Sequence, residues 1–197
     1  MKKKNGFTLI ELMVVIAVIG ILAVVLVPNV TQAVNKGRVA RTVQELQLIA
    51  NAMDAYLLDV GSYPPSIPDF GRAWGADVGL VDKNAVHPSH LSAWAGPYLK
   101  SWPQRTAWGG LVAAMGATGA YYIARVAAWG VLDWIDRDGI AGNDYYVHMN
   151  PYYARYPPQM ALEIDKVMDD GVANTGNVRI IENVSVYSYV GEGVYSW

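Results

Sequence analysis

The chain has 197 residues with a formal net charge of −2, and charged residues make up only 16% of it. A near-neutral charge gives no electrostatic basis for binding DNA or RNA, so we expect no nucleic acid among its partners. Cysteine is absent, which excludes disulfides and leaves packing, a metal ion or assembly to stabilise one globular domain of ordinary size.

A basic leader followed by a long apolar run opens the chain. Lysines precede Gly6, and residues 12–27 carry no polar side chain. Counted from Phe7, the run has about the 20 residues that span a bilayer as a helix. The lysines predict that its N-terminal flank stays cytoplasmic. Glu11 lies one helical turn inside the run, where a carboxylate is costly and marks a functional residue with a partner.

The segment KNGFTLIE, from Lys4 to Glu11, resembles the signal of type IV pilins and type II secretion pseudopilins. The resemblance implies that a prepilin peptidase cleaves between Gly6 and Phe7 and methylates the new amine of Phe7. Residues 1–6 would then be a cleaved leader, and the apolar helix would stay as the anchor. An uncleaved signal anchor or a buried core helix is the alternative, but neither explains Glu11 so near a glycine junction.

Cleavage would place a positive amine on Phe7 within the first helical turn. In lipid or in a filament core, this charge and that of Glu11 are each costly unless paired. The helix N-terminus also favours an anion. We therefore expect the Phe7 amine of a neighbouring subunit to pair with Glu11 during assembly, as the family resemblance also implies. A bond between Glu11 and its own N-terminus is the alternative, and both can occur at different stages.

Gly20 and Pro28 stand at the family's positions for a weak stretch of this helix. Proline removes a backbone donor and clashes with the preceding turn, and glycine costs about 1 kcal/mol relative to alanine. The resemblance implies a transmembrane and filament-core helix over residues 7–28 that loosens between these two positions. A simple kink at Pro28 is the alternative.

An amphipathic half of the same helix is expected over residues 29–61. Apolar residues recur there at three- and four-residue spacing and form one stripe: Val39, Val43, Leu46, Ala50, Met53, Leu57 and Val60. Gly61 should end the helix, and Pro64 with Pro65 should prevent it from resuming. The stripe would pack against a globular head, residues 62–197.

Two short motifs, one at the end of the helix and one in the head, resemble the major pseudopilin of type II secretion systems. One is the D-x-G-x-Y-P turn at Asp59–Pro64, and the other is the G-P-Y-L segment at Gly96–Leu99. The mostly apolar residues 109–132 depart from that pattern. They predict a buried strand or short helix, a surface covered by neighbouring subunits, or a second membrane span.

The tail from Arg179 to Trp197 is expected to form strands. Two valines alternate there with polar and aromatic residues, which is the period of two typical of a strand: Val184, Ser185, Val186, Tyr187 and Tyr189. Gly191 and Gly193 predict a turn. The expected fold class is therefore α+β, with a long N-terminal helix packed on a small antiparallel β-sheet, as in pilins.

An acidic, glycine-rich stretch, DWIDRDGIAGND, is the strongest polar cluster. Asp136, Asp138 and Asp144 suit calcium, which takes about six to eight hard oxygen ligands from a flexible loop. Major pseudopilins resembling this chain carry a calcium loop near the C-terminus. The stretch lacks the final glutamate of an EF-hand, so a solvated acidic turn is the alternative.

The remaining titratable clusters predict no site. Asp165, Asp169 and Asp170 are expected to close a short helix and start the final strand rather than bind metal. The histidines complete no zinc site, because no cysteine or nearby acidic pair accompanies them: His87, His90 and His148.

No catalytic fingerprint is present, and we expect the chain not to be an enzyme. The resemblance implies a structural subunit of a type IV pilin-like filament, most like the major pseudopilin of a type II secretion system. Its implied partners are copies of itself, a prepilin peptidase and an inner-membrane assembly platform. It would cross the inner membrane once, with its head outside the cytoplasm, and assemble into a periplasmic or extracellular filament.

Two other functions remain open at this point. One is the major pilin of a surface pilus used for adhesion or motility. The other is a membrane-anchored binding module that carries a pilin-type signal. Gene neighbourhood would separate the first of these from a pseudopilin, and purification as long fibres would exclude the second.

Overall fold

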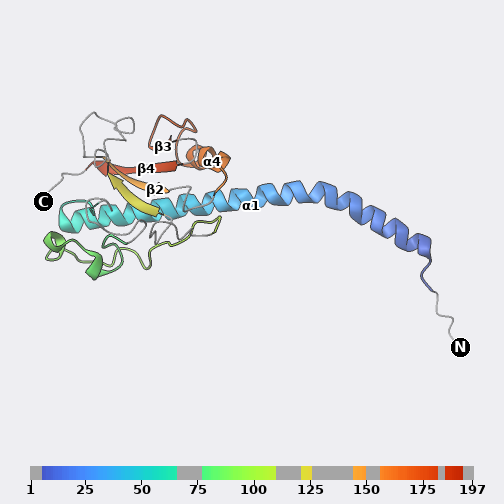
Figure 1. The fold of residues 1–197 in the computed structure, drawn as a ribbon, viewed down its shortest axis with the longest axis horizontal. Helices are drawn as coiled ribbons and strands as arrows, with labels where there is room; N and C mark the ends of the chain where they lie inside the picture. Colours follow the sequence, from blue (N-terminus) through green and yellow to red (C-terminus); the bar gives the residue numbers. More distant parts are fainter. Residues whose placement is uncertain are drawn as a thin grey trace. The chain divides into compact units, whose positions relative to one another are not determined.

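The computed structural model describes residues 6–65, 77–109, 121–125, 144–149, 156–181 and 185–192. Its helices and strands, in chain order, are α1 (Leu9–Val60), η1 (Lys83–Ala85), η2 (Pro88–His90), β1 (Tyr121–Arg125), β2 (Asp144–Met149), α4 (Gln159–Met168), β3 (Val178–Ile181) and β4 (Ser185–Glu192) (Figure 1). The chain divides into two compact units, Met1–Arg38 and Val39–Trp197.

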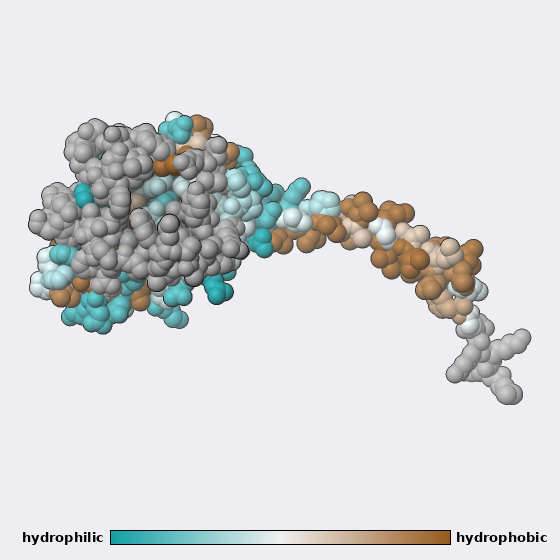
Figure 2. Space-filling view, in the orientation of Figure 1, coloured by the Kyte–Doolittle hydropathy of each residue, from teal (hydrophilic) through white to brown (hydrophobic). Residues whose placement is uncertain are grey.

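The first unit contains the apolar part of α1. The helix runs on through Pro28, and Thr31 Oγ1 donates a hydrogen bond to the Val27 carbonyl at 3.0 Å. Within the described ranges, α1 is long and apolar enough to cross a membrane. Apolar side chains cover this part of the helix (Figure 2), and Phe7 is 81% exposed. An apolar surface of this extent is typical of a segment that lipid or other protein covers.

The second half of α1 supplies one wall of the head's core. Four residues of the predicted stripe are buried, while Ala50, Leu57 and Val60 are half-buried. The buried face is wider than the predicted stripe, because residues on its flank are buried as well: Thr42, Ile49, Ala52 and Tyr56. A wide apolar face is what a helix needs when a sheet, rather than a single helix, packs on it.

The end of α1 confirms the predicted stop. The helix ends at Val60, and Gly61 follows with a φ of 83°. The Gly61 N–H donates to the Leu57 carbonyl at 2.8 Å, which satisfies one of the last helical acceptors. A left-handed residue at this position favours glycine, and the prolines that follow cannot continue the helix.

Among the described residues of the head, four strands form an antiparallel sheet in the order β1-β2-β4-β3. The sheet and the second half of α1 share one hydrophobic core, to which α4 adds Ala161 and Ile164. Figure 1 shows β2 and β4 beside this half of α1. The α+β fold with a long helix on a small antiparallel sheet is thereby confirmed. β1 also confirms the buried-strand interpretation for part of the apolar segment 109–132.

Burial in the sheet differs from the two-sided pattern that alternation implies. All residues of β2 are buried, and the first four residues of β4, Ser185 to Ser188, are buried without a break. Valine and tyrosine therefore point to opposite faces of β4, and both faces are covered. The predicted strand period is confirmed, and the structure adds that both faces of β4 are buried over these four residues.

Gly191 lies inside β4, so this residue does not form the predicted turn, and Gly193, the other residue of that prediction, lies outside the described residues. A Cβ atom at this position would lie 2.2 Å from the Tyr63 hydroxyl oxygen. That hydroxyl donates to Asp54 Oδ1 at 2.9 Å, and the Tyr63 ring packs on Tyr145 at a centroid distance of 4.8 Å. Glycine is present because a tyrosine approaches the strand closely, which is the other common reason for glycine in a strand.

Gly191→Ala should therefore lower the free energy of unfolding by about 1–3 kcal/mol, the usual cost of forcing extra atoms into a packed site. Tyr63→Phe removes the atom that the new methyl group meets. In that background the cost of Gly191→Ala should fall well below its cost in the parent. Urea unfolding of the four proteins, each in detergent, gives the coupling energy. Additive effects of the two substitutions would contradict this close approach.

Candidate functional site

The start of α1 is closed by a reciprocal pair of hydrogen bonds between Thr8 and Glu11. Glu11 Oε2 accepts from the Thr8 backbone N–H at 2.8 Å and from Thr8 Oγ1 at 2.7 Å. The Glu11 N–H in turn approaches Thr8 Oγ1 at 3.3 Å. This is a capping box, with Thr8 as N-cap and Glu11 three residues on. The sequence pattern T-x-x-E indicates a capping box, but of these two residues only Glu11 is predicted from the sequence to be functional.

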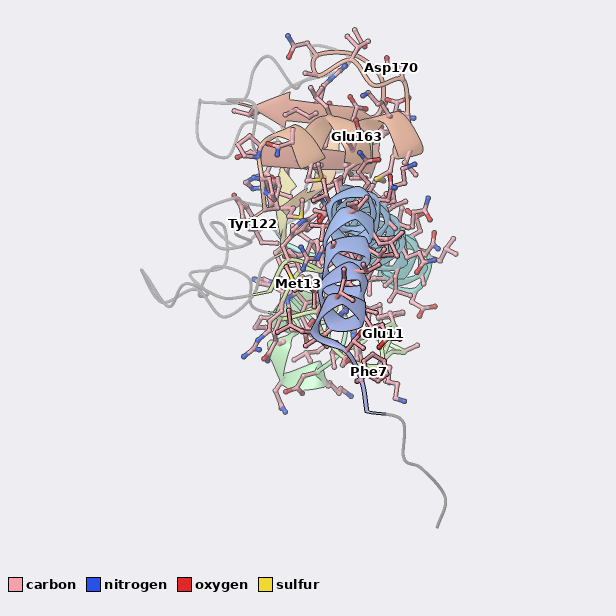
Figure 3. All side chains as sticks on the ribbon, turned by 90° about the vertical axis from the view of Figure 1, so that its right-hand side faces the viewer. Phe7, Glu11, Met13, Tyr122, Glu163 and Asp170 are labelled. Carbon is pink, nitrogen blue, oxygen red and sulfur yellow. The ribbon has the colours of Figure 1, made fainter. Side chains whose placement is uncertain are left out.

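The capping box fixes where the Glu11 carboxylate lies before any partner arrives. Both side-chain bonds fall on Oε2, so Oε1 keeps its capacity to accept further hydrogen bonds. Phe7 and Glu11 lie at the same end of α1 (Figure 3). Pairing of Glu11 with a free Phe7 amine, in its own chain or a neighbour, stays a prediction, because Phe7 is joined to Gly6 in this chain.

The predicted cleavage junction lies outside the helix. Gly6 and Phe7 precede Leu9, where α1 begins, and both residues are exposed. A Cβ atom at Gly6 would meet no atom within 4 Å. A protease therefore has access to the junction, and the chain itself does not require glycine there.

Gly20 and Pro28 both lie within the continuous helix α1. A Cβ atom at Gly20 would meet no atom within 4 Å, so no contact within the described chain requires glycine at this position. The proposed loosening of the helix between these positions in a filament stays a prediction.

The predicted calcium loop is described only at its last ligand. Asp136 and Asp138 lie outside the described residues. Asp144 is the first residue of β2, is fully buried and is in register with Glu192 of β4. Calcium binding by these three residues stays a prediction.

Asp165, Asp169 and Asp170 do close a short helix. The Asp169 N–H donates to the Asp165 carbonyl at 2.7 Å, and α4 ends at Met168. Asp169 Oδ2 then accepts from the N–H groups of Asn177 and Val178, where β3 begins. The predicted helix end is confirmed, although the strand that follows is β3 and not the final strand. No pattern in the sequence indicates that Asp165 is buried.

Two histidines have structural roles that their sequence positions did not indicate. His90 is buried, with Nδ1 at 2.7 Å from the Tyr56 hydroxyl and Nε2 at 3.2 Å from the Ser62 hydroxyl. It therefore joins η2 to the end of α1. Burial, and secondarily the charge of His87, lower the pKa of His90.

His148 lies within the sheet between two tyrosine rings. It stacks on Tyr187 at a centroid distance of 3.9 Å and meets Tyr122 edge to face at 4.3 Å. Neither ring nitrogen has a hydrogen-bond partner among the residues described. Burial holds the pKa of His148 well below its usual 6.5, so the ring is neutral in the folded protein.

Acid should destabilise the head through His148. Below about pH 6.5 His148 binds a proton in the unfolded chain but stays neutral in the folded protein. The free energy of unfolding therefore falls by up to about 1.4 kcal/mol per pH unit per such histidine. His90 acts in the same direction. His148→Phe should unfold at least as late as the parent at pH 7.5 and lose less stability between pH 7 and 6.

Chemical unfolding of both proteins over this pH range measures the difference. The range stops at pH 6 because Asp165 acts oppositely as the pH falls through about 6, although it does so equally in both proteins. Its pKa is raised from 3.8 to about 6, first by burial and then by the charges of Asp170 and Asp169. The folded protein therefore binds that proton first as the pH falls. Equal acid sensitivity of the His148→Phe protein and the parent would contradict the assignment.

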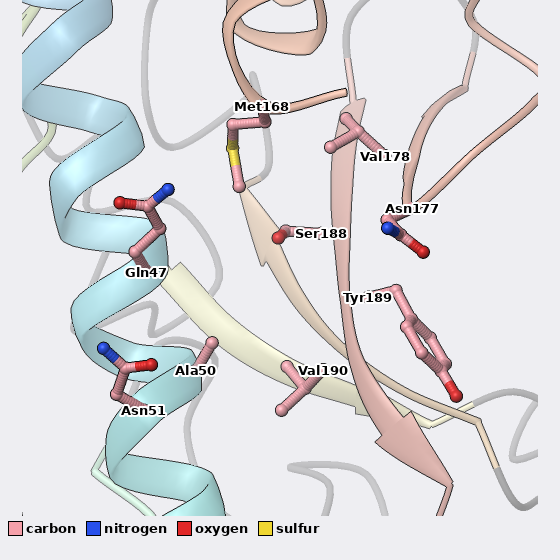
Figure 4. Close-up of a pocket in the computed structure, with 9 residues that line it drawn as sticks. All are labelled: Gln47, Ala50, Asn51, Met168, Asn177, Val178, Ser188, Tyr189 and Val190. Carbon is pink, nitrogen blue, oxygen red and sulfur yellow. The ribbon is translucent and has the colours of Figure 1, made fainter. Parts of the chain in front are cut away.

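A groove of about 400 Å³ lies between α1 and the strands β3 and β4 (Figure 4). Among the described residues its lining is Gln47, Ala50, Asn51, Met168, Asn177, Val178, Ser188, Tyr189 and Val190. These residues offer amide and hydroxyl groups for hydrogen bonds. They include no carboxylate, histidine or lysine that could act as a general base near neutral pH.

Comparison with known proteins identifies the family. Residues 1–27 match the prokaryotic N-terminal methylation motif, and residues 29–123 match the family described as type II secretion system (T2SS), protein G. The chain is 37% identical over 103 residues to type II secretion system core protein G of Aeromonas hydrophila, covering 52% of this chain and 67% of that protein. The chain belongs to the type II secretion system protein G family.

Other members of the protein G family give the same result. The protein of this name from Vibrio cholerae is 36% identical over 109 residues, covering 55% of this chain and 68% of its own length. That of Klebsiella michiganensis is 29% identical over 145 residues, covering 73% and 90%. No solved structure gives a significant match. The protein G match ends at residue 123, so β2, α4, β3 and β4 lie beyond it.

Proposed function

We propose that this chain is the structural subunit of a type II secretion pseudopilus, the major pseudopilin, and acts by assembly rather than catalysis. The observation that carries the proposal is the start of α1. A methylation-type junction, an exposed apolar helix and a capped Glu11 follow one another there, in a chain of the protein G family.

Each part of the chain then has a mechanical role. Residues 1–6 are the leader, which a prepilin peptidase removes between Gly6 and Phe7 before methylating Phe7. Residues 7–28 are the anchor in the inner membrane and later the filament core. Residues 29–61 are the amphipathic half of the helix, and residues 62–197 form the head outside the cytoplasm.

The Glu11 carboxylate makes the free energy of the anchor lower in the filament than in lipid. Lipid tails are as apolar as valine and leucine, so moving the anchor from lipid into a bundle of anchors gains little hydrophobic free energy. A carboxylate in hydrocarbon without a counter-charge is unfavourable. A neighbour's Phe7 amine relieves that cost only when the two subunits are staggered correctly, so the pair selects one register.

Gly20 and Pro28 allow the helix to loosen as a filament extends. An inner-membrane assembly platform adds subunits at the base. Calcium held by Asp136, Asp138 and Asp144 would stabilise a head that has no disulfide.

Deletion of the gene in its own host, with plasmid complementation, tests the proposal. A pseudopilin should be required for release of folded exoproteins into the medium, and the deletion should leave them in the periplasm. Overproduction should give filaments that contain this chain, visible by electron microscopy. Normal secretion with loss of surface pili would assign the chain to a surface pilus. Normal secretion with no filaments under any condition would overturn both assignments and favour an anchored binding module.

A further inference from the structure

A fully buried carboxylate stands near the end of α4. Asp165 has no exposed surface, and neither of its carboxylate oxygens has a hydrogen-bond partner among the described residues. Buried polar groups in folded proteins are nearly always hydrogen-bonded, and buried charges are paired or bind a metal ion. The Gly171 N–H and the Arg179 guanidinium favour the charged form of Asp165, but neither carboxylate oxygen accepts a hydrogen bond of normal geometry from the described residues.

Two further carboxylates converge on Asp165. Asp165, Asp169 and Asp170 each place one carboxylate oxygen within 4.8 Å of the other two. Calcium holds its oxygen ligands at about 2.3–2.6 Å, so ligands on opposite sides of the ion are about 4.6–5.2 Å apart. The three oxygens therefore fit around one calcium ion. In Figure 3, Asp170 lies in the turn that follows α4.

The loop after α4 holds the two other carboxylates by bonds within the protein. Asp169 Oδ2 accepts the backbone N–H groups of Asn177 and Val178. Asp170 accepts the Val172 N–H at 2.7 Å and the Thr175 hydroxyl at 2.5 Å. Each carboxylate oxygen can accept more than one bond, so both residues keep capacity for a cation.

Glycine is required where the loop passes Asp169. A Cβ atom at Gly176 would lie 1.6 Å from Asp169 Oδ2, and Gly176 has a φ of 68°. The backbone can approach the carboxylate this closely only because no side chain intervenes. The position of the Asp169 carboxylate is thus set by the chain, independently of any ion.

The local charge also suits a divalent ion. Arg179 of β3 interacts electrostatically with Asp165 and Asp170. Its Nε and Nη1 atoms are buried without a hydrogen-bond partner among the described residues. Three carboxylates carry a charge of −3 and the guanidinium adds +1, which leaves −2 for a bound cation to neutralise. Burial and the two neighbouring carboxylates raise the pKa of Asp165 to about 6, and a bound cation would lower it again.

We propose that Asp165, Asp169 and Asp170 form a divalent-cation site between α4 and β3, and that the site prefers calcium. All three ligands are hard oxygens, and calcium accepts about six to eight of them in flexible geometry, whereas magnesium demands a near-ideal octahedron. Waters would complete the coordination sphere. The site is separate from the acidic loop that ends at Asp144, and it lies beyond the residues that match the protein G family.

Calcium titration of the full chain in detergent, after stripping with a chelator, tests the site. Calorimetry gives the number of ions bound, and thermal unfolding gives the shift in Tm. The matched variants are Asp165→Asn, Asp170→Asn and the control Glu163→Gln, an exposed acidic residue of α4 that pairs with Lys166. Each is measured with and without Asp138→Ala, so that binding by the predicted acidic loop is counted separately.

In the Asp138→Ala background, calcium should raise the Tm of the parent and of Glu163→Gln and bind with one ion per chain. Magnesium should give a smaller shift. Asp165→Asn and Asp170→Asn should lose at least tenfold in calcium affinity. Asp165→Asn should also unfold later than the parent when no metal is present, because it removes a buried charge.

Two results would overturn the site. One is the absence of both binding heat and Tm shift with calcium in the parent. The other is an unchanged calcium affinity in Asp170→Asn, an exposed position whose substitution leaves the core intact. Neither result bears on the pseudopilin proposal, since secretion and filament formation are measured separately.

Discussion

Replacing Gly6 with phenylalanine should leave residues 1–6 on the chain in a host that carries the prepilin peptidase. The substitution does not strain the protein, because a Cβ atom at Gly6 would meet nothing within 4 Å and the residue precedes the helix. Loss of cleavage would therefore report the fit of the peptidase around this position. Gly6→Ala should show the same effect to a smaller degree.

Mass spectrometry of the membrane fraction measures the outcome. The parent should begin at a methylated Phe7, and the Gly6→Phe protein should begin in the leader. Gly37→Ala is the matched control, since a Cβ there also meets nothing within 4 Å but the position lies inside α1. A parent chain that keeps Met1 or its lysines in a peptidase-positive host would show that the segment is no prepilin signal.

Glu11→Leu should insert stably into the membrane and yet almost abolish filaments. Removing one partner of a buried ion pair costs about 3 kcal/mol or more, which is about a hundredfold in an association constant. Leucine removes both the charge and the cap on Thr8, so a second variant is needed to tell them apart. Glu11→Gln keeps an acceptor for the Thr8 bonds but cannot neutralise an amine.

Filament yield in the sheared fraction, divided by the amount of subunit in the membrane, is the measurement. If the charge pair sets assembly, glutamine should be nearly as defective as leucine. Normal assembly of the glutamine variant with failure of the leucine variant would instead assign the role of Glu11 to helix capping. Normal assembly of both would leave apolar packing as the determinant of register.

Local chemistry explains which parts of the structure the sequence could predict. The stop after Val60 depends on a glycine and two prolines within five residues, and the buried face of α1 depends on spacing within the helix. The capping box could also have been predicted from the sequence, because Thr8 and Glu11 are three residues apart. It was missed because the carboxylate was considered only as a charge in lipid.

Contacts between distant segments explain the rest. In the sequence, Gly191 indicates a turn, but in the fold it makes room for Tyr63. His90 is typical of a loop, but in the fold its ring contacts Tyr56, 34 positions earlier. In the sequence, nothing distinguishes Asp165 from the acidic residues near it. Its burial depends on how α4 and the loop before β3 pack, which no short motif encodes. Each of these features requires the tertiary fold to be known.

The strand order has a consequence for how the head can be exported. β4 lies between β2 and β3 and is the partner of both. Until residue 192 has emerged from the translocation channel, β2 has only β1 beside it and β3 has no strand to pair with. Sheet formation therefore depends on contacts between distant segments, which form slowly. If the head is exported as proposed, its sheet can be complete only after β4 has crossed the membrane.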